Sequence, residues 1–171
     1  MPDPLSSPEA YQVFVYTLAE EFPGIRRSTL VYVPSGVFFG RVEGILLFDQ
    51  NLVLCVQEYL NFELGVIEGY GYEVSLAHAS PETPDYPTGA EYCRANYPDK
   101  DKLYWYDSFP HPTDPALAAT HPHHKHIVPD IRHHRIPAPE LSFTRPNLPY
   151  LIREIEQLLK HSAQFSEGAI S

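Results

Sequence analysis

Positive charge, cysteine and long apolar runs are all scarce in this 171-residue chain. Twelve Lys and Arg residues stand against 22 Asp and Glu residues, which gives a formal net charge of −10 with histidine neutral. This balance argues against a protein that coats nucleic acid non-specifically, because such binding needs clustered basic residues. No stretch reaches the roughly 18 apolar residues of a spanning helix, and residues 1–8 do not resemble a signal peptide. We expect a cytoplasmic protein.

The two cysteines, Cys55 and Cys93, do not form a closely spaced pair of the kind that binds zinc. We expect both to be reduced, one in a strand and one in a loop. Most of the 18 prolines follow residue 80, which predicts a second half rich in loops.

Apolar residues at helical spacing predict a helix near each end of the chain. The first begins after Ser6 or Ser7, with Glu9 placed for a capping box with Ser6, and ends at Pro23-Gly24. The second begins after Asn147, which would cap it. Its apolar stripe is formed by Leu148, Leu151, Ile152, Ile155, Leu158 and Leu159. We expect both helices to pack on a sheet.

Runs of β-branched and aromatic residues between the helices predict an antiparallel sheet of four to five strands. The expected strands are 29–33, 37–48, 52–62, 70–77 and 103–109, the second bent at Gly40 or Gly44. Their connections are too short for crossover helices. Residues 79–102 predict a long surface excursion, and residues 165–171 a loose tail. The sequence therefore predicts one α+β domain over residues 1–171, with the sheet flanked by an N-terminal and a C-terminal helix.

Seven of the nine histidines lie between His111 and His134. The segment is neutral to basic within an acidic chain. Histidine exchanges protons near neutral pH and is the commonest metal ligand. Core packing does not explain such a density of histidine, so this segment is the strongest candidate for chemistry.

One hypothesis is metal-independent cleavage of RNA. The 2′-hydroxyl of RNA attacks the phosphate if one group removes its proton, another protonates the leaving oxygen, and a cation stabilises the transition state. Two histidines and a lysine supply these groups. In an extended segment His124 and His126 face one side while His123 and Lys125 face the other, so one strand cannot direct all four at one substrate.

Two alternatives stay open. Histidines two residues apart on a strand, His124 and His126, can bind zinc or another divalent transition metal with a carboxylate from Asp107, Asp130 or Glu58. No spacing matches an established zinc signature. The other alternative is a non-enzymatic segment, stiffened by proline, that binds a partner protein.

Further candidates lie outside the histidine segment. Trp105 and Tyr106 are placed to stack on bases of single-stranded RNA. Arg41 and Arg135 are candidates for phosphate contact, with a solvated arginine as the simpler interpretation of Arg41. Glu58 shares its strand face with apolar residues and needs a partner or a raised pKa, unless it is exposed at an edge near Asn61, which is the expectation we favour.

Three short motifs resemble the DUF6516 family, which includes the TumE-type toxins of bacterial toxin–antitoxin pairs. They are Tyr106-Asp107-Ser108, Pro110-His111 and the run Pro122-His123-His124-Lys125-His126. The family shows a "RYDNAPHH" stretch followed by "PHHKH". The resemblance covers about residues 37–159, and also includes a strand around Gly40-Arg41, Asp49 in a hairpin, Glu58 in the next strand, and Tyr70 and Tyr72 in a third.

The chain departs from the family pattern in ways that mark a divergent member. Trp105 and Ser108 replace the usual Arg and Asn around Tyr106-Asp107, which removes a candidate phosphate contact. The excursion over 80–102 is longer than the usual hairpin, and His133-His134 are extra.

The resemblance implies a growth-inhibiting toxin neutralised by a helix-turn-helix antitoxin, with RNA cleavage as its activity. By matched position it implies that the catalytic residues are Asp107, His111, His123, His124, Lys125 and His126. We expect His124 or His126 to act as acid or base, Lys125 or Arg135 to hold phosphate, and Asp107 to fix a histidine tautomer. No cofactor is expected in this mechanism, and an inactive homologue that only binds a partner, or an oligomer, is left open.

Overall fold

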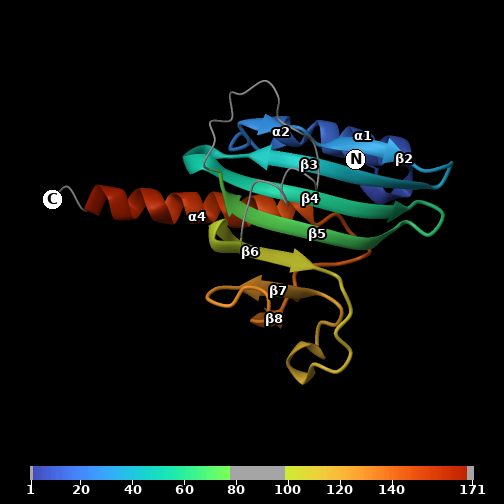
Figure 1. The fold of residues 1–171 in the computed structure, drawn as a ribbon. Helices are drawn as coiled ribbons and strands as arrows, with labels where there is room; N and C mark the ends of the chain where they lie inside the picture. Colours follow the sequence, from blue (N-terminus) through green and yellow to red (C-terminus); the bar gives the residue numbers. More distant parts are fainter. Residues whose placement is uncertain (1, 78–98, 169–171) are drawn as a thin grey trace.

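Short turns between apolar strands produce the centre of the fold. The computed structural model describes residues 2–77 and 99–168, with side chains placed as far as Ser162. Strands β3 (Phe39–Leu47), β4 (Leu52–Asn61) and β5 (Val66–Leu76) pair in chain order as an antiparallel meander (Figure 1). The predicted α+β class is confirmed.

The sheet is larger than the four to five strands expected, because short strands extend it at both sides. The described sheet has eight strands in the order β1-β3-β4-β5-β6-β7-β8, with β2 also on β3. The strands predicted at 29–33 and 103–109 are β2 (Val31–Pro34) and β6 (Lys102–Asp107), and the added elements are β1 (Arg27–Ser28), β7 (His124–Ile127) and β8 (Arg135–Pro137). Strands of two to four residues carry too few side chains to show an alternating pattern.

Gly44 explains why the region before β3 forms two strands. It has φ +141, and a Cβ there would lie 2.6 Å from the backbone oxygen of Thr29. The close approach admits only glycine. β3 therefore pairs with β2 before this point and with β1 after it.

The N-terminal helix forms in two pieces, α1 (Pro8–Tyr16) and α2 (Leu18–Glu21), after the 3₁₀ turn η1 (Pro4–Ser6). Ser7 caps α1 by accepting from the amide of Ala10 at 3.0 Å, so Ser6 makes no capping box with Glu9. Thr17 separates the pieces, and its hydroxyl donates to the carbonyl of Val13 at 2.7 Å. This side-chain hydrogen bond competes with the backbone hydrogen bonds of the helix.

The C-terminal helix α4 (Leu148–Gly168) begins where predicted and continues past Gln164, where we expected a loose tail. Its second half projects beyond the sheet (Figure 1). Asn147 does not use its side chain as the expected cap. Instead its Oδ1 accepts from the amide of Ser142 and its Nδ2 donates to the Ser142 carbonyl. The remaining turns are η2 (Asp49–Asn51), η3 (Asp99–Asp101) and η4 (Pro115–Leu117).

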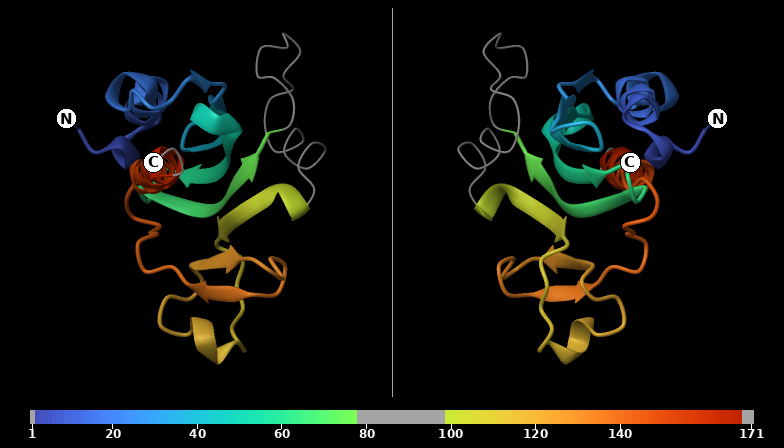
Figure 2. Two further views of the ribbon diagram at one scale, coloured as in Figure 1. Left: turned by 90° about the vertical axis from the view of Figure 1, so that its left-hand side faces the viewer. Right: turned by 90° about the vertical axis from the view of Figure 1, so that its right-hand side faces the viewer.

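The helices lie on one face of the sheet, as the end-on views of Figure 2 show. The main core joins α1, α2 and the first turns of α4 to inward residues of β3 to β6. A smaller apolar cluster lies on the opposite face, formed by Ile45, Leu47, Val53, Cys55 and Ala77. We call these the helix face and the open face of the sheet.

Cys55 is disulfide-bonded, so the expected reduced thiol is wrong for this residue; Cys93 lies outside the described residues. Of the expected excursion over 79–102, only 99–102 is described, as η3 and the start of β6. Within residues 2–77 and 99–168, no helix has the length and apolar character that a bilayer span requires.

Glu58 lies on the helix face and is fully buried, which corrects the expected exposure at an edge. Its carboxylate accepts from the hydroxyls of Tyr11 at 2.5 Å and Tyr72 at 2.6 Å. Asn147 donates to the Tyr72 hydroxyl at 3.2 Å. Burial raises the pKa of Glu58, while the two tyrosine hydrogen bonds oppose this. The network links β4 and β5 to α1 and to the start of α4.

We expect Glu58→Ala to lower the free energy of unfolding by about 3 kcal/mol, because two buried hydroxyls lose their acceptor and a cavity forms. The matched control Glu58→Gln keeps a polar side chain of the same size without a buried charge, and should lose less than half as much. Urea unfolding followed by circular dichroism measures both. An unchanged midpoint for Glu58→Ala would contradict a structural role for this network.

Candidate functional site

The pairing of β6 with β7 brings four of the sequence-predicted residues together, Trp105, Asp107, His124 and His126. The antiparallel register places Asp107 opposite His124 and Trp105 opposite His126. Residues paired across strands project from the same face, as do residues two apart on one strand. All four side chains therefore lie on the open face, away from the helices. The predicted alternation of β7 is confirmed by its burial pattern and contacts.

Asp107, His124 and His126 converge on one point, and we call them the trio. His124 Nε2 lies 3.0 Å from Asp107 Oδ1 and 3.1 Å from His126 Nε2. His126 Nε2 lies 3.2 Å from Asp107 Oδ2. In the described part of the chain, this is the one cluster of three His, Cys, Asp or Glu residues whose donor atoms could share a metal ion.

Backbone and ring contacts fix the orientation of each trio side chain. His124 Nδ1 lies 2.9 Å from the carbonyl oxygen of Pro122, and His126 Nδ1 lies 2.7 Å from that of Ile131. A carbonyl only accepts, so both Nδ1 atoms carry hydrogen. Asp107 accepts from the indole N–H of Trp105 at 3.1 Å and from the Phe109 amide at 2.9 Å. Each ligand atom therefore faces the centre of the trio.

The charges within the trio are strongly coupled. Burial raises the pKa of Asp107, but hydrogen bonds to His124 and His126 outweigh it, so the pKa lies well below its usual range. Burial lowers the pKa of His124, but the hydrogen bonds to Asp107 and to the Pro122 carbonyl, together with the charge of Asp107, outweigh it and the pKa is raised. The trio is thus arranged to hold positive charge against an ionised carboxylate.

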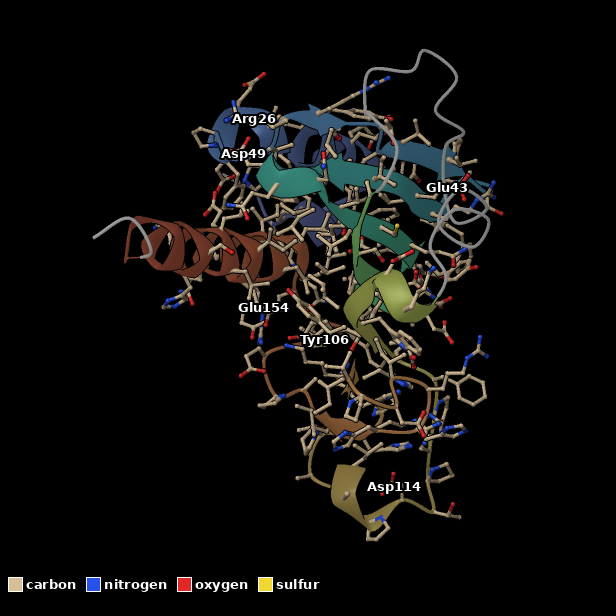
Figure 3. The ribbon with its side chains drawn as sticks, turned by 60° about the vertical axis from the view of Figure 1, so that its left-hand side comes forward. Arg26, Glu43, Asp49, Tyr106, Asp114 and Glu154 are labelled. Atoms are coloured by element: carbon tan, nitrogen blue, oxygen red, sulfur yellow. The ribbon has the colours of Figure 1, made fainter. Side chains whose placement is uncertain are left out.

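Lys125 lies on the helix face, apart from the trio. Its ammonium group is 3.3 Å from Glu154 Oε2 on α4 and lies over the rings of Tyr104 and Tyr106. The Tyr106 hydroxyl donates to the same oxygen at 2.8 Å, and Figure 3 shows Tyr106 and Glu154 side by side between the sheet and the helix. These contacts attach β7 to α4 and direct both Lys125 and Tyr106 away from the open face.

His123 also lies on the helix side, at the start of β7. Its Nδ1 is 2.6 Å from the Tyr70 hydroxyl, and its ring packs against Tyr70 and Phe143. Burial, then the nearby positive charge of Arg145, lowers the pKa of His123. The structure therefore does not bring His123 to the trio.

His111 and Arg135 lie beside the trio. The His111 and His124 rings meet edge to face, with their centroids 4.9 Å apart. Burial, followed by the charge of Arg135, lowers the pKa of His111. Arg135 is the cross-strand partner of His126 on β8. Its Nε is buried and makes no hydrogen bond within the described part of the protein.

Two residues beside the trio were missed by sequence reasoning. Phe109 is 68% exposed and contacts the edge of His111, which makes it a surface for base stacking. Gly71 pairs with Asp107, and no described atom lies within 4 Å of where its Cβ would be. The glycine thus leaves space next to the carboxylate. The available signal for Phe109 in the sequence was an aromatic residue two positions before His111; Gly71 carries no such signal.

Of the remaining candidates, only Trp105 contacts the trio. Arg41 lies on β3, three strand spacings or about 14 Å from β6, and forms an ion pair with Glu43 at 3.2 Å. Trp105 lies on the open face, where its ring contacts His126 at 4.3 Å and Lys102 at 5.0 Å. Asp130 binds His133, and Glu58 lies on the helix face, so neither supplies the carboxylate of a metal site here.

A family model described as "Toxin TumE" matches residues 17–159. The chain belongs to the TumE toxin family. The match includes the trio, His111 and Arg135, and it assigns a toxin-like role in a toxin–antitoxin system, which implies an antitoxin partner. No match was found among curated proteins or among solved structures.

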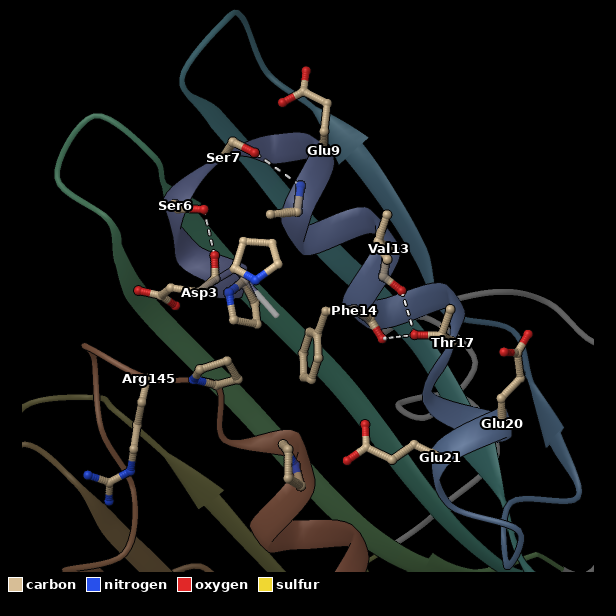
Figure 4. A pocket seen from close by; sticks show the side chains of 15 residues that line it. Asp3, Ser6, Ser7, Glu9, Val13, Phe14, Thr17, Glu20, Glu21 and Arg145 are labelled. Atoms are coloured by element: carbon tan, nitrogen blue, oxygen red, sulfur yellow. Dashed lines mark hydrogen bonds between the residues drawn. The ribbon is translucent and has the colours of Figure 1, made fainter.

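A groove of about 1160 Å³ lies on the helix side of this TumE-family chain, between α1 and the start of α4 (Figure 4). Most of its lining precedes the matched region. The apolar part includes Val13 and Phe14, and Val13 is 57% exposed. The charged lining residues are Asp3, Glu9, Glu20, Glu21 and Arg145. The groove is therefore apolar with an acidic rim.

Asp107→Asn tests the charge coupling in the trio. Because the pKa of Asp107 is lowered, the ionised carboxylate stabilises the fold above its ordinary pKa of about 4. This contribution is lost as pH falls through the pKa that Asp107 has in the folded protein. Because the pKa of His124 is raised, its stabilisation is present below about pH 6.5 and is lost as pH rises through the folded value. We expect the free energy of unfolding of wild type to exceed that of Asp107→Asn by about 1–2 kcal/mol between about pH 4 and pH 6.5, and by less above this range.

Urea unfolding between pH 4 and pH 9, with a chelator present, measures this difference. His133→Ala serves as control because it removes an exposed histidine–aspartate pair, which should change stability little at any pH. A difference between wild type and Asp107→Asn that is constant with pH would show that the trio is not coupled in this way.

Proposed function

We propose that the chain is an RNA-cleaving toxin whose reaction centre is the trio with His111 and Arg135. The observation that supports this most is the convergence of a carboxylate and two imidazoles beside an arginine Nε without a hydrogen bond in the described structure. Family membership supports the toxin role. The finer statement, RNA cleavage, rests on the chemistry of these groups.

The spacing within the trio restricts how it can act. A general acid and a general base must lie on either side of the reacting phosphate. His124 Nε2 and His126 Nε2 are 3.1 Å apart, which leaves no space for a phosphate between them. His124 is also 0% exposed. The trio therefore acts as one unit that holds a positive charge, supplied by a shared proton or by a metal ion.

The residues beside the trio supply the other roles. His111 has a lowered pKa, so it is neutral near pH 7 and can accept the proton of the 2′-hydroxyl. The 2′-oxygen then forms a bond to phosphorus, and the bond from phosphorus to the 5′-oxygen breaks. When the trio holds a shared proton, the 5′-oxygen takes that proton; a metal ion held by the trio would instead stabilise the charge on that oxygen, and water would supply the proton. Arg135 stabilises the charge on the phosphate. Phe109 offers a face on which a base can stack.

The negative net charge of the chain does not prevent RNA binding at the trio itself. The net charge of −10 disfavours broad non-specific binding to RNA. Locally, Arg135 and the trio place positive charge beside an exposed aromatic ring. We therefore expect weak general affinity and cleavage of particular exposed nucleotides.

The groove between α1 and α4 favours a second function, binding of the antitoxin. Its acidic rim and apolar floor complement an amphipathic segment with basic residues. DNA-binding domains such as a helix-turn-helix antitoxin carry basic surfaces of this kind. The groove lies on the helix side, so this contact is separate from the trio on the open face. An inactive homologue would keep this function alone.

Inducible expression in bacteria tests the proposed activity. We expect wild type to arrest growth with breakdown of total RNA, and the double variant His124→Ala/His126→Ala to reduce cleavage by on the order of a hundredfold, as loss of acid–base groups does. The matched control His133→Ala/His134→Ala also removes two histidines, but both are exposed, and it should behave as wild type.

Because His124 and His126 are buried, Asp107→Asn is tested as well, and circular dichroism of each purified variant shows whether it is folded. A folded Asp107→Asn or double variant that arrests growth and degrades RNA as wild type does would refute the assignment of the reaction centre. Intact RNA in cells arrested by wild type would refute RNA cleavage itself.

Val13→Arg tests the groove. The added charge and bulk should reduce co-purification with the antitoxin at least tenfold, because a buried unpaired charge is costly at an interface. The control is Val37→Arg, at an exposed valine that does not line the groove. Equal co-purification of both variants with the antitoxin encoded beside the toxin would exclude the groove as its binding site.

A further inference from the structure

Three hydrogen-bond acceptors meet at the trio in a way that requires a cation. Both Nδ1 atoms are committed to backbone carbonyls, so each neutral imidazole presents the lone pair of Nε2 to the centre. The Asp107 carboxylate adds an oxygen. The two Nε2 atoms and the carboxylate oxygens are 3.0–3.2 Å apart. At this distance their lone pairs repel one another unless a proton or a metal ion lies among them.

We propose that Asp107, His124 and His126 bind one divalent transition metal ion through a carboxylate oxygen and the two Nε2 atoms. Ligand atoms about 2.0–2.1 Å from one ion are about 3.3 Å apart in a tetrahedral site and about 3 Å apart in an octahedral one. The trio distances of 3.0, 3.1 and 3.2 Å agree with these values. Binding needs only small side-chain shifts.

The contacts around the trio are those of a metal site. Metal-bound histidines almost always donate their other ring N–H to a carbonyl or carboxylate, and metal-bound carboxylates accept further hydrogen bonds. His124 and His126 donate to Pro122 and Ile131. Asp107 accepts from Trp105 and from the Phe109 amide. Because these hydrogen bonds already hold the three side chains in place, metal binding would order few further groups.

The ligand set indicates which ions fit. Two imidazoles and one carboxylate suit zinc, iron, cobalt, nickel or copper, whereas magnesium and calcium prefer oxygen ligands alone. Three protein ligands leave at least one coordination position open, as in catalytic rather than structural zinc sites. The trio therefore matches a catalytic site for a transition metal.

Gly71 leaves the trio accessible from one side. Asp107 is the most accessible member of the trio, with its side chain 26% exposed, whereas His124 and His126 are buried. Gly71 lies opposite Asp107, and no described atom occupies the space of its missing side chain. A water or a phosphate oxygen reaches the ion from this side. That the phosphate is that of RNA rests on the proposed function, whereas metal binding does not.

Metal content tests the proposal directly. Protein made without a histidine tag is stripped with EDTA, and zinc binding is measured by calorimetry alongside the visible spectrum of the cobalt(II) form. We expect one equivalent in wild type and affinity at least tenfold lower in His124→Ala and Asp107→Asn. His133→Ala/His134→Ala should bind as wild type does. Binding of less than one equivalent by wild type, or unchanged binding by both folded trio variants, would overturn the proposal.

A second variant separates the metal site from the reaction. Gly71→Phe fills the space beside Asp107 without removing a ligand, so it should keep zinc affinity within about twofold and lose RNA cleavage. RNA cleavage by wild-type protein shown to be metal-free would overturn the catalytic role of the ion. Zinc binding at the trio without RNA breakdown would support the metal site and refute the proposed function, so that the two failures are distinguishable.

Discussion

The register between β6 and β7 is the constraint on which the candidate site depends. Asp107 and His124 are 17 residues apart in the chain, yet the antiparallel pairing places them directly opposite each other. A shift of one residue would direct every β7 side chain to the other face of the sheet. His124 and His126 would then point toward α4, and Lys125 would lie beside Asp107. The trio exists because this alternative register is excluded.

Contacts on the helix face exclude it. Lys125 binds Glu154 on α4 and lies over Tyr104 and Tyr106, so β7 is held by its other set of side chains. Further along the same face, Glu58 links Tyr11 and Tyr72 in the core. Because alternate side chains of a strand face opposite sides of the sheet, the run His-His-Lys-His has two roles. One side anchors β7 to the fold, and the other presents imidazoles to the open face.

The separation of the two faces also bears on regulation in the TumE family. The trio lies on the open face, and the acid-rimmed groove lies between α1 and α4 on the helix side. A toxin has to remain inactive while its antitoxin is bound, so an antitoxin in this groove must act through a second contact or by changing the fold. Because most of the groove lining precedes residue 17, where the family match begins, the proposed antitoxin contact would lie largely outside the region that the family model covers.

Local patterns in the sequence determined the two helices, the central meander, the division of β7 into two faces and the histidine segment as the candidate site. These depend on periodicity, capping residues and turns, which act over a few residues. The tertiary structure decided which residues meet. Lys125 and Tyr106, predicted at the site, lie on the helix face, while Gly71 and Phe109 lie beside the trio. Pairing between strands joins residues far apart in the chain, so burial and register decide it, and no local pattern encodes them.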